Sequence, residues 1–231
     1  ITVFSFHPVK IITTGEGGAI ITDDPVLAKL VRAFRDWGRD CYCMGGENNT
    51  CGKRFTQQFG NLPSGYDHKY VYSEIGYNLK MTDIQAAIGS AQMDKLADFC
   101  EKRKENFKKH YNIFAKYPGY FSLPTATENS DPAWFAFIVT VKPEAPFTRD
   151  EITRHFSSKL IETRNLFAGN MTKQPAFVGK EWRIADNLNV TDTIMNRTFF
   201  LGTYPGLTDE MFAYEKSVLD EYIHDLTNKT V

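Results

Sequence analysis

The sequence has no long apolar run and almost no net charge. None of its stretches approaches the roughly 20 apolar residues that a membrane-spanning helix requires, and its first residues do not follow the pattern of a signal peptide. The formal net charge of −1 at pH 7 gives no overall attraction to nucleic acid or acidic membranes. Hydrophobic residues make up 42% and charged residues 24% of the 231 residues, as in ordinary globular proteins. We therefore predict a cytoplasmic protein that binds neither nucleic acid nor membranes.

Cysteine is scarce, and three of the four cysteines lie in one predicted loop. Gly, Asn and Pro recur from Gly38 to about Tyr70, which predicts a loop longer than compact domains usually have; such loops are commonly functional or disordered. The loop holds Cys41, Cys43 and Cys51. Because disulfides are uncommon in cytosolic proteins, these residues are either free thiols or ligands of a metal or iron–sulfur site. Their spacing alone favours free thiols, since it is not a common zinc pattern.

A lysine stands between two predicted strands near the start of the chain. Residues 1–6 are rich in β-branched and aromatic side chains, Pro8 halts that strand, and a glycine cluster at 15–18 precedes a second strand at 19–22. Lys10 occupies the turn between them. A lysine amine whose position and surroundings are fixed can form a Schiff base with a carbonyl or with pyridoxal phosphate. Lys10 is therefore a candidate reactive residue, with an ordinary solvated lysine as the alternative.

The string Ser5-Phe6-His7-Pro8-Val9-Lys10, followed by Gly15-Glu16-Gly17-Gly18, resembles the lysine segment of the DegT/StrS-type sugar aminotransferases. These are pyridoxal-phosphate enzymes of the aspartate-aminotransferase fold that act on nucleotide-linked keto sugars. The resemblance implies that Lys10 carries the cofactor and that Ser5 helps to hold its phosphate. His7 is a candidate base beside Lys10, with a structural role at the strand end as the alternative.

A second segment, Gly76-Tyr77-Asn78, resembles the part of this family whose asparagine reaches the cofactor phosphate of the neighbouring subunit. An amide can donate to phosphate without itself titrating. The resemblance therefore implies that Asn78 binds the cofactor and that the protein is a homodimer with shared active sites. Without the resemblance, Asn78 would be interpreted as a turn residue.

Three loop segments resemble one branch of the family, the CDP-4-keto-6-deoxyglucose 3-dehydrases: residues 34–43, 49–51 and 65–70. These enzymes make precursors of the 3,6-dideoxyhexoses of lipopolysaccharide, with a reductase as electron donor. In this branch three cysteines at this spacing and a fourth far upstream ligate a [2Fe–2S] cluster. The resemblance implies that Cys41, Cys43 and Cys51 are metal ligands and that the fourth ligand precedes Ile1. Cys100 lies in a predicted helix and is better interpreted as a small core residue.

The sequence leaves two reactions open. The dehydrases of this branch carry a histidine at the position of Lys10, whereas the aminotransferases carry the Schiff-base lysine. The cysteines, Lys80 and the segment at 166–170 favour the dehydrase. We therefore predict C3 dehydration or deoxygenation of a nucleotide-linked 4-keto-6-deoxyhexose with pyridoxal or pyridoxamine phosphate. A nucleotide-sugar aminotransferase that uses Lys10 is the alternative, and a non-catalytic homologue is a third hypothesis.

The pattern of elements predicts an α/β protein in two parts. Residues 1–118 are expected to form the C-terminal portion of a cofactor domain that ends in a long connecting helix, and residues 119–231 a small α+β domain, with Pro118-Gly119 at the boundary. The resemblance implies an aspartate-aminotransferase-like fold of type I. Because the sequence opens at Ile1 without a methionine, we expect it to be the later part of a longer protein; a domain that begins with a strand is the alternative.

The apolar periodicity and the capping residues place the remaining elements. Asp24 is predicted to cap the first helix, Thr148 and Glu151 to form a capping box, and Met211 and Tyr214 to face inward on the last helix. Helices are predicted at 25–37, from Thr82 through the charged run at 101–109, at 148–159 and at 208–226, and strands at 135–141, 161–167 and 198–204. Arg164 and Lys173 are candidate partners of the substrate diphosphate, as a bidentate and a point charge respectively. Surface charges without a ligand are the alternative interpretation.

Overall fold

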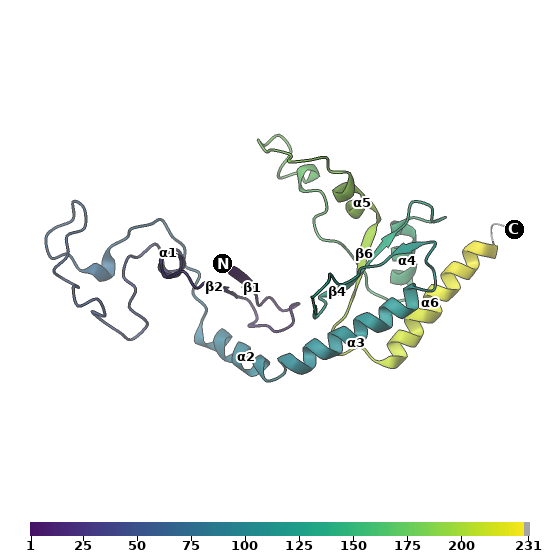
Figure 1. Cartoon of the computed structure of the whole chain (residues 1–231), viewed down its shortest axis with the longest axis horizontal. Helices are drawn as coiled ribbons and strands as arrows, with labels where there is room; N and C mark the ends of the chain where they lie inside the picture. The colour runs from purple at the N-terminus through teal and green to yellow at the C-terminus, as the bar shows by residue number, and fades with distance from the viewer. Residues whose placement is uncertain (229–231) are drawn as a thin grey trace. The chain divides into compact units, whose positions relative to one another are not determined.

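A computed structural model describes residues 1–228, and the chain divides into unit 1 (Ile1–Asp94) and unit 2 (Lys95–Val231). Figure 1 follows the chain from the purple N-terminal hairpin to the yellow C-terminal helix. No helix between residues 1 and 228 is both long and apolar enough to cross a membrane.

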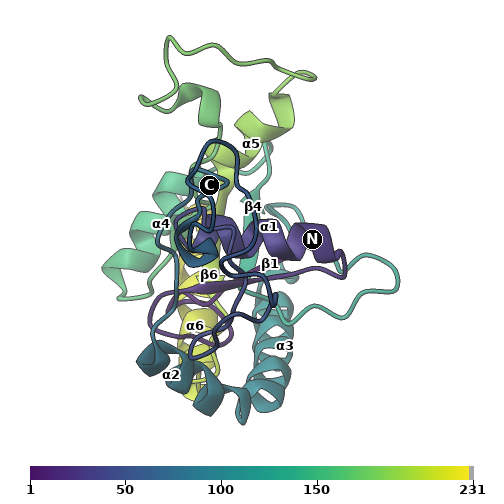
Figure 2. The same cartoon turned by 90° about the vertical axis from the view of Figure 1, so that its left-hand side faces the viewer.

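Unit 1 begins with an antiparallel hairpin of β1 (Thr2–Ser5) and β2 (Gly18–Ile21), followed by helix α1 (Pro25–Arg35). The predicted cap of α1 is confirmed: the Asp24 carboxylate accepts hydrogen bonds from two backbone N–H groups of the first turn, which are otherwise unpaired at a helix start. Figure 2 shows the hairpin and α1 from a second direction. Side chains of both elements line one groove.

The long loop predicted after α1 is confirmed. Between α1 and α2 (Asp83–Met93) the only helical piece is the 3-10 turn η1 (His68–Tyr70). Helix α2 begins with a capping box, in which Thr82 and Gln85 each bond the other's backbone N–H. None of the residues of α2 is buried, so packing within unit 1 does not explain its apolar residues.

Unit 2 contains an antiparallel sheet with the strand order β3-β4-β6-β5. The central strands β4 (Ala136–Val141) and β6 (Thr198–Gly202) pair over their length, and the edge strands β3 (Phe121–Ser122) and β5 (Arg164–Asn165) are short. Short edge strands limit pairing with other chains. Only two residues of the extended segment predicted at 161–167 therefore join the sheet.

Helices α3 (Leu96–Phe114), α4 (Arg149–Ser158) and α6 (Asp209–Asn228) bury one face of this sheet. The core on this face consists of the buried residues Phe107, Ile113, Phe114, Phe121, Phe137, Val139, Val141, Phe147, Ile152, Phe156, Phe199, Leu201, Phe212, Val218, Leu219 and Ile223. Figure 1 shows α3 and α6 side by side, as their contacts require. A further helix, α5 (Asn189–Arg197), and a 3-10 turn, η2 (Met171–Lys173), complete the unit.

The helix predicted to run from Thr82 through residues 101–109 is interrupted. Asp94 and Lys95 separate α2 from α3, although no Gly or Pro marks the break. The division between the units falls here rather than at residue 118, because α3 packs against β4 and α6 of unit 2.

Candidate functional site

The turn after β1 places three candidate residues on one short segment. The Ser5 hydroxyl oxygen accepts a hydrogen bond from the His7 backbone N–H at 3.4 Å, and the Lys10 backbone N–H donates to the His7 carbonyl at 2.9 Å. The ring Nδ1 of His7 also lies 3.3 Å from the Val9 backbone nitrogen. Ser5, His7 and Lys10 therefore belong to one closed turn. Lys10 is half-buried, whereas Ser5 and His7 are exposed.

The glycines after this turn allow the backbone to return beside β1. The Phe6 N–H donates to the Gly17 carbonyl at 2.8 Å, and the Thr14 N–H donates to the Phe6 carbonyl at 3.0 Å. A Cβ at Gly18 would lie 2.5 Å from the Phe4 carbonyl oxygen, and one at Gly17 would lie 2.7 Å from the Thr14 hydroxyl oxygen. Both contacts are too close for a side chain, so this return requires glycine.

Gln85 connects the lysine turn to the segment that carries Asn78. Its side-chain amide nitrogen donates to the Glu16 carbonyl at 3.1 Å, while its amide oxygen accepts from the Thr82 backbone N–H at 2.9 Å. Glu16 in turn lies 3.7 Å from His7, measured from carboxylate oxygen to ring Nε2. One side chain thus links residues that are far apart in the sequence.

The segment that carries Asn78 is bonded along its backbone to the end of α1. The Trp37 N–H donates to the Tyr77 carbonyl at 2.8 Å, the Tyr77 N–H donates to the Phe34 carbonyl at 2.7 Å, and Asp36 pairs with Asn78 in an antiparallel bridge. These bonds position Asn78, which is exposed.

Two glycines allow this close approach. A Cβ at Gly38 would lie 1.9 Å from the Glu74 carbonyl oxygen, and one at Gly76 would lie 2.3 Å from the Gly38 nitrogen. Gly38 also has φ +84°, in the left-handed region that favours glycine. The end of α1 and the segment at 74–79 are therefore in direct backbone contact.

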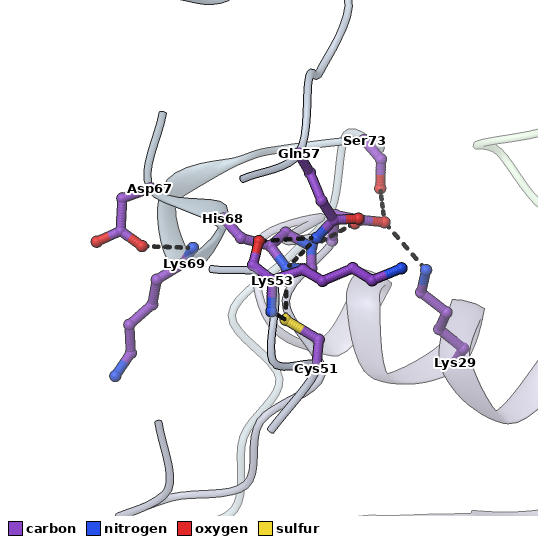
Figure 3. Close-up of polar contacts among 9 residues, drawn as sticks. Lys29, Cys51, Lys53, Gln57, Asp67, His68, Lys69 and Ser73 are labelled. Carbon is purple, nitrogen blue, oxygen red and sulfur yellow. Dashed lines mark hydrogen bonds and ion pairs between the residues drawn. The ribbon is translucent and has the colours of Figure 1, made fainter. Parts of the chain in front are cut away.

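The cysteine loop is organised around the buried side chain of His68. Its Nε2 lies 2.6 Å from an Asp40 carboxylate oxygen, its Nδ1 lies 3.6 Å from the Cys51 sulfur, and its ring stacks on Phe59 at 4.9 Å between centroids. Figure 3 shows Cys51 and Gln57 beside the imidazole. Burial opposes the ionisation of Asp40, but its hydrogen bonds to His68 and Lys29 outweigh burial and lower the pKa of this carboxyl.

A second polar contact closes the same loop. The Arg54 guanidinium binds the Asp67 carboxylate in a bidentate manner, with N···O distances of 2.8 and 2.6 Å, and this lowers the pKa of Asp67 to about 2. Asp67 also caps η1 by accepting from the Lys69 N–H at 3.0 Å. The loop is thus an ordered structure that is held by polar side chains.

All three predicted cysteine ligands line one small hollow in this loop, together with His68 and Lys69. Burial raises the pKa of the Cys41 thiol, and hydrogen bonding to Thr50 lowers that of Cys43. Within residues 1–228, however, no three His, Cys, Asp or Glu side chains are grouped closely enough to hold a metal ion. The arrangement in this structure therefore does not itself fit a metal centre.

The two predicted diphosphate partners lie in unit 2, and both are exposed and paired with carboxylates of the same chain. Arg164, in β5, pairs with Glu162, and the Lys173 ammonium lies 2.8 Å from a carboxylate oxygen of Asp192. The buried amide of Asn170 donates to the same Asp192 oxygen at 2.7 Å. No contact in the structure brings the two candidates together.

Sequence reasoning missed three residues that organise the site: His68, Asp40 and Gln85. His68 stands inside one of the segments that carried the family resemblance, but His68 and Asp40 are separated by 28 residues of loop. No periodic pattern connects such positions. A capping signal at Thr82 was available for Gln85, but nothing in the sequence indicated its second bond to Glu16.

Comparison with known proteins identifies similar sequences over most of the chain. The model of the DegT/DnrJ/EryC1/StrS aminotransferase family matches residues 1–215. The lipopolysaccharide biosynthesis protein RfbH of Salmonella typhimurium strain LT2 is 50% identical over 218 residues, which are 94% of this chain and 50% of that protein. The dTDP-4-dehydro-2,6-dideoxy-D-glucose 3-dehydratase of Saccharopolyspora spinosa is 45% identical over 223 residues, which are 96% of this chain and 48% of that protein.

The fold has counterparts among solved structures. The structure of E. coli GDP-4-keto-6-deoxy-D-mannose-3-dehydratase with bound hydrated PLP matches with a TM-score of 0.77 at 22% identity, over 94% of this chain and 53% of that one. This match confirms the aspartate-aminotransferase-like α/β fold that the sequence predicts. The chain spans about half the length of the curated relatives it matches.

Proposed function

Because the chain belongs to the DegT/DnrJ/EryC1/StrS aminotransferase family, we propose that it acts in a pyridoxal-phosphate-dependent enzyme that removes the C3 oxygen of a nucleotide-linked 4-keto-6-deoxyhexose. Its relative at 45% identity is named as a 3-dehydratase of a dTDP-linked sugar, and its relative at 50% identity as a lipopolysaccharide biosynthesis protein. The product we propose is a precursor of a 3,6-dideoxyhexose of lipopolysaccharide. A cytoplasmic location stays a prediction.

The observation that carries this proposal is the closed turn at residues 5–10. It presents the Ser5 hydroxyl and the half-buried Lys10 side chain on one segment. A hydroxyl can donate to a phosphate, and a lysine amine can react with an aldehyde. The residues present therefore fit pyridoxal phosphate, with Ser5 and Asn78 as phosphate donors.

The amine form of the cofactor, when bound at the C4 ketone, would supply the electron pair that expels the C3 hydroxyl, by losing a proton from its own C4′ carbon. In this proposal, Lys10 accepts a proton at its Nζ atom and then returns it. His7 is held in the same turn, 3.7 Å from the Glu16 carboxylate, and can act as a second base. Arg164 and Lys173 would bind the diphosphate of the nucleotide by exchanging their present carboxylate partners for phosphate oxygens.

Amino transfer is the second candidate reaction, and the identity of Lys10 favours it. A primary amine at this position can anchor the cofactor covalently, which a histidine base does not do. The same turn then serves a nucleotide-sugar aminotransferase. The product distinguishes the two reactions, because one yields a C3-deoxygenated sugar and the other an amino sugar formed only with an amino donor.

We also propose that Cys41, Cys43 and Cys51, after a rearrangement of the loop, would be ligands of a [2Fe–2S] cluster, which would supply electrons with a reductase as their source. Their shared hollow beside His68 supports this assignment. A [2Fe–2S] cluster needs four ligands, so a fourth thiolate and a rearrangement of the loop are required. Iron analysis and the electron paramagnetic resonance spectrum of the reduced full-length protein test this proposal, and a protein that is free of iron after anaerobic purification would contradict it.

A homodimer with shared sites is part of the same proposal. Asn78 is exposed, and its neighbours Ile75 and Leu79 are 94% and 67% exposed, which suits an interface with a second subunit. Replacing Asn78 by Ala should weaken cofactor retention in an intact dimer. Unchanged retention would contradict the role of Asn78.

The experiment that tests the proposed function is carried out on full-length protein. A Lys10-linked cofactor gives a visible absorption band that borohydride removes, and a cluster adds a broad brown spectrum. Incubation with nucleotide-linked 4-keto-6-deoxyhexoses and a reductant should then yield a C3-deoxygenated product. An amino sugar formed only with an amino donor would establish the second candidate, and a colourless protein without either product would establish the non-catalytic hypothesis.

A further inference from the structure

Lys80 lies at the centre of a polar cluster beside Asn78. Its ammonium nitrogen is 2.9 Å from an Asp36 carboxylate oxygen, 3.1 Å from the Asn78 amide oxygen and 3.3 Å from the centroid of the Trp37 ring. The first two contacts are hydrogen bonds and the third is a cation–π contact. Three groups thus fix the position of one flexible side chain.

The backbone conformation of Trp37 indicates that the residues around it hold it in one position. Trp37 has φ +61°, which is uncommon for a bulky residue and persists only where the surroundings require it. Its N–H is bonded to the Tyr77 carbonyl, and the Arg39 guanidinium also lies over its ring, 4.9 Å from the centroid. The Trp37 ring that contacts the Lys80 ammonium is therefore held by the same backbone contacts that position Asn78.

The contact with Lys80 determines which end of the Asn78 amide is used. An ammonium group only donates hydrogen bonds, so the amide atom that faces Lys80 is the oxygen. Phosphate oxygens at neutral pH accept, so a phosphate must be bound by the amide nitrogen. Lys80 therefore selects the amide orientation that leaves the donor end for an anion. Because its own charge is paired with Asp36, we expect this orienting effect to exceed its direct attraction for phosphate.

We propose that Lys80 is a positioning residue for the cofactor phosphate, acting through the Asn78 amide. The inference rests on the proposed function, in which Asn78 binds the phosphate of pyridoxal phosphate. It assigns Lys80 no contact with the reacting atoms. It predicts that the effects of Lys80 and Asn78 are coupled, since one residue acts through the other.

The test measures the binding of two ligands by the full-length protein, pyridoxal phosphate and pyridoxal. Asn78→Ala should weaken pyridoxal phosphate binding about tenfold, as expected for the loss of one hydrogen bond to a charged group. Lys80→Met should produce a similar loss, and the double variant should lose no more than either single variant. Binding of pyridoxal, which has no phosphate, should be unchanged in all three proteins.

Conservative replacements separate orientation from packing. Lys80→Arg keeps a cation that only donates and should restore most of the affinity, whereas Lys80→Gln, whose amide can present either end, should not. Lys102→Met is the matched control, because Lys102 is an exposed lysine of α3 that is also paired with a carboxylate, that of Asp98. It should bind pyridoxal phosphate like the unmodified protein.

Four results would overturn the inference. Losses that multiply in the double variant would show that Lys80 attracts the phosphate directly. An equal loss of pyridoxal binding would show a general structural defect. Unchanged binding in Lys80→Met, with a loss in Asn78→Ala, would reject the role of Lys80 and keep that of Asn78. Unchanged binding in Asn78→Ala would reject the phosphate role of Asn78 in the proposed function itself.

Discussion

The two units of this chain are stabilised in different ways. Unit 2 has a continuous aromatic and aliphatic core beneath its sheet. In unit 1, Ala33 and Val71 are the only buried hydrophobic residues among those that the structure describes, and Ile75 and Ile84 are 94% and 77% exposed. Burial of apolar surface is the main favourable contribution to folding. Unit 2 therefore has its own source of stability, whereas unit 1 depends on backbone hydrogen bonds, glycine contacts and polar networks.

The residues proposed for the chemistry and the residues of the buried core lie in different units. The residues proposed to hold the cofactor, Ser5, Lys10 and Asn78, all lie in unit 1 on turns and loops. Catalytic and binding residues are found on loops more often than in cores. The apolar side chains that unit 1 leaves exposed suit the second subunit that we propose, which would complete both the site and the unit.

The strongest test of the difference between the two units is a substitution in unit 1 that removes activity without affecting folding stability. Lys10→Ala should lower turnover by about 10²- to 10⁴-fold, which is typical for the loss of a positioned proton donor and acceptor. The circular dichroism spectrum should be unchanged, because Lys10 lies outside the core. Lys108→Ala, which alters an exposed lysine of α3, is the control and should keep full activity.

Lys10→His sharpens the same test by distinguishing the two candidate reactions. A histidine can act as a base but cannot anchor the cofactor covalently. Deoxygenation should therefore persist in this variant, whereas amino transfer should be lost. Full amino transfer by Lys10→His would show that Lys10 is not the anchoring residue.

A pair of truncations compares the two units directly. Phe137 is fully buried between Phe107, Phe114 and His110, so Phe137→Ala should destabilise unit 2 by about 3–5 kcal/mol. Ile84→Ala should change folding stability by less than about 0.5 kcal/mol, as at other exposed positions. Amide hydrogen exchange in β4 and α2 measures the two effects.

The same pair tests the proposed interface. Ile84→Ala should weaken dimerisation, as measured by analytical ultracentrifugation of the full-length protein. Equal destabilisation by the two substitutions would contradict the comparison, because it would mean that unit 1 has a core of its own.

The smallest expected effect concerns the pH dependence of the cysteine loop. Arg54 lowers the pKa of Asp67 to about 2, below its ordinary value near 3.8, so the folded loop favours the ionised carboxylate. This contribution to stability is present above about pH 4 and is lost as the pH falls towards 2. Exchange of the His68 amide, which is bonded to the Arg54 carbonyl at 2.9 Å, should accelerate over this range beyond its intrinsic pH dependence.

Asp67→Asn is the control for this measurement. Its loop should exchange faster at pH 6 and show little additional change between pH 4 and 2. A parallel pH response in the two proteins would show that another group is responsible.

The sequence predicts much of the local structure because local signals specify it. The Asp24 cap of α1 and the capping box of Thr148 and Glu151 in α4 are confirmed. The continuous helix predicted after Thr82 is wrong, since apolar spacing continues across Asp94 and Lys95 and no helix-breaking residue marks the interruption. Met211 and Tyr214 of α6, predicted to face inward, are each 49% exposed.

Only part of the candidate site can be predicted in this way. The turn with Ser5 and Lys10 and the segment with Asn78 are each contiguous in sequence. The contact between Lys80 and Asp36 spans 44 residues, and that between His68 and Asp40 spans 28. Such pairs depend on the path of the loop, which no propensity or periodicity encodes.

The contact between Gly38 and Gly76 has a consequence for engineering. Because the two glycines are in contact, the segment of residues 39–75 leaves the rest of unit 1 and returns to it at the same place. We expect that this segment can be transplanted between relatives, provided that both glycines are transplanted with it. The cysteine loop of one relative can then be exchanged for that of another while the turn at residues 5–10 stays in place.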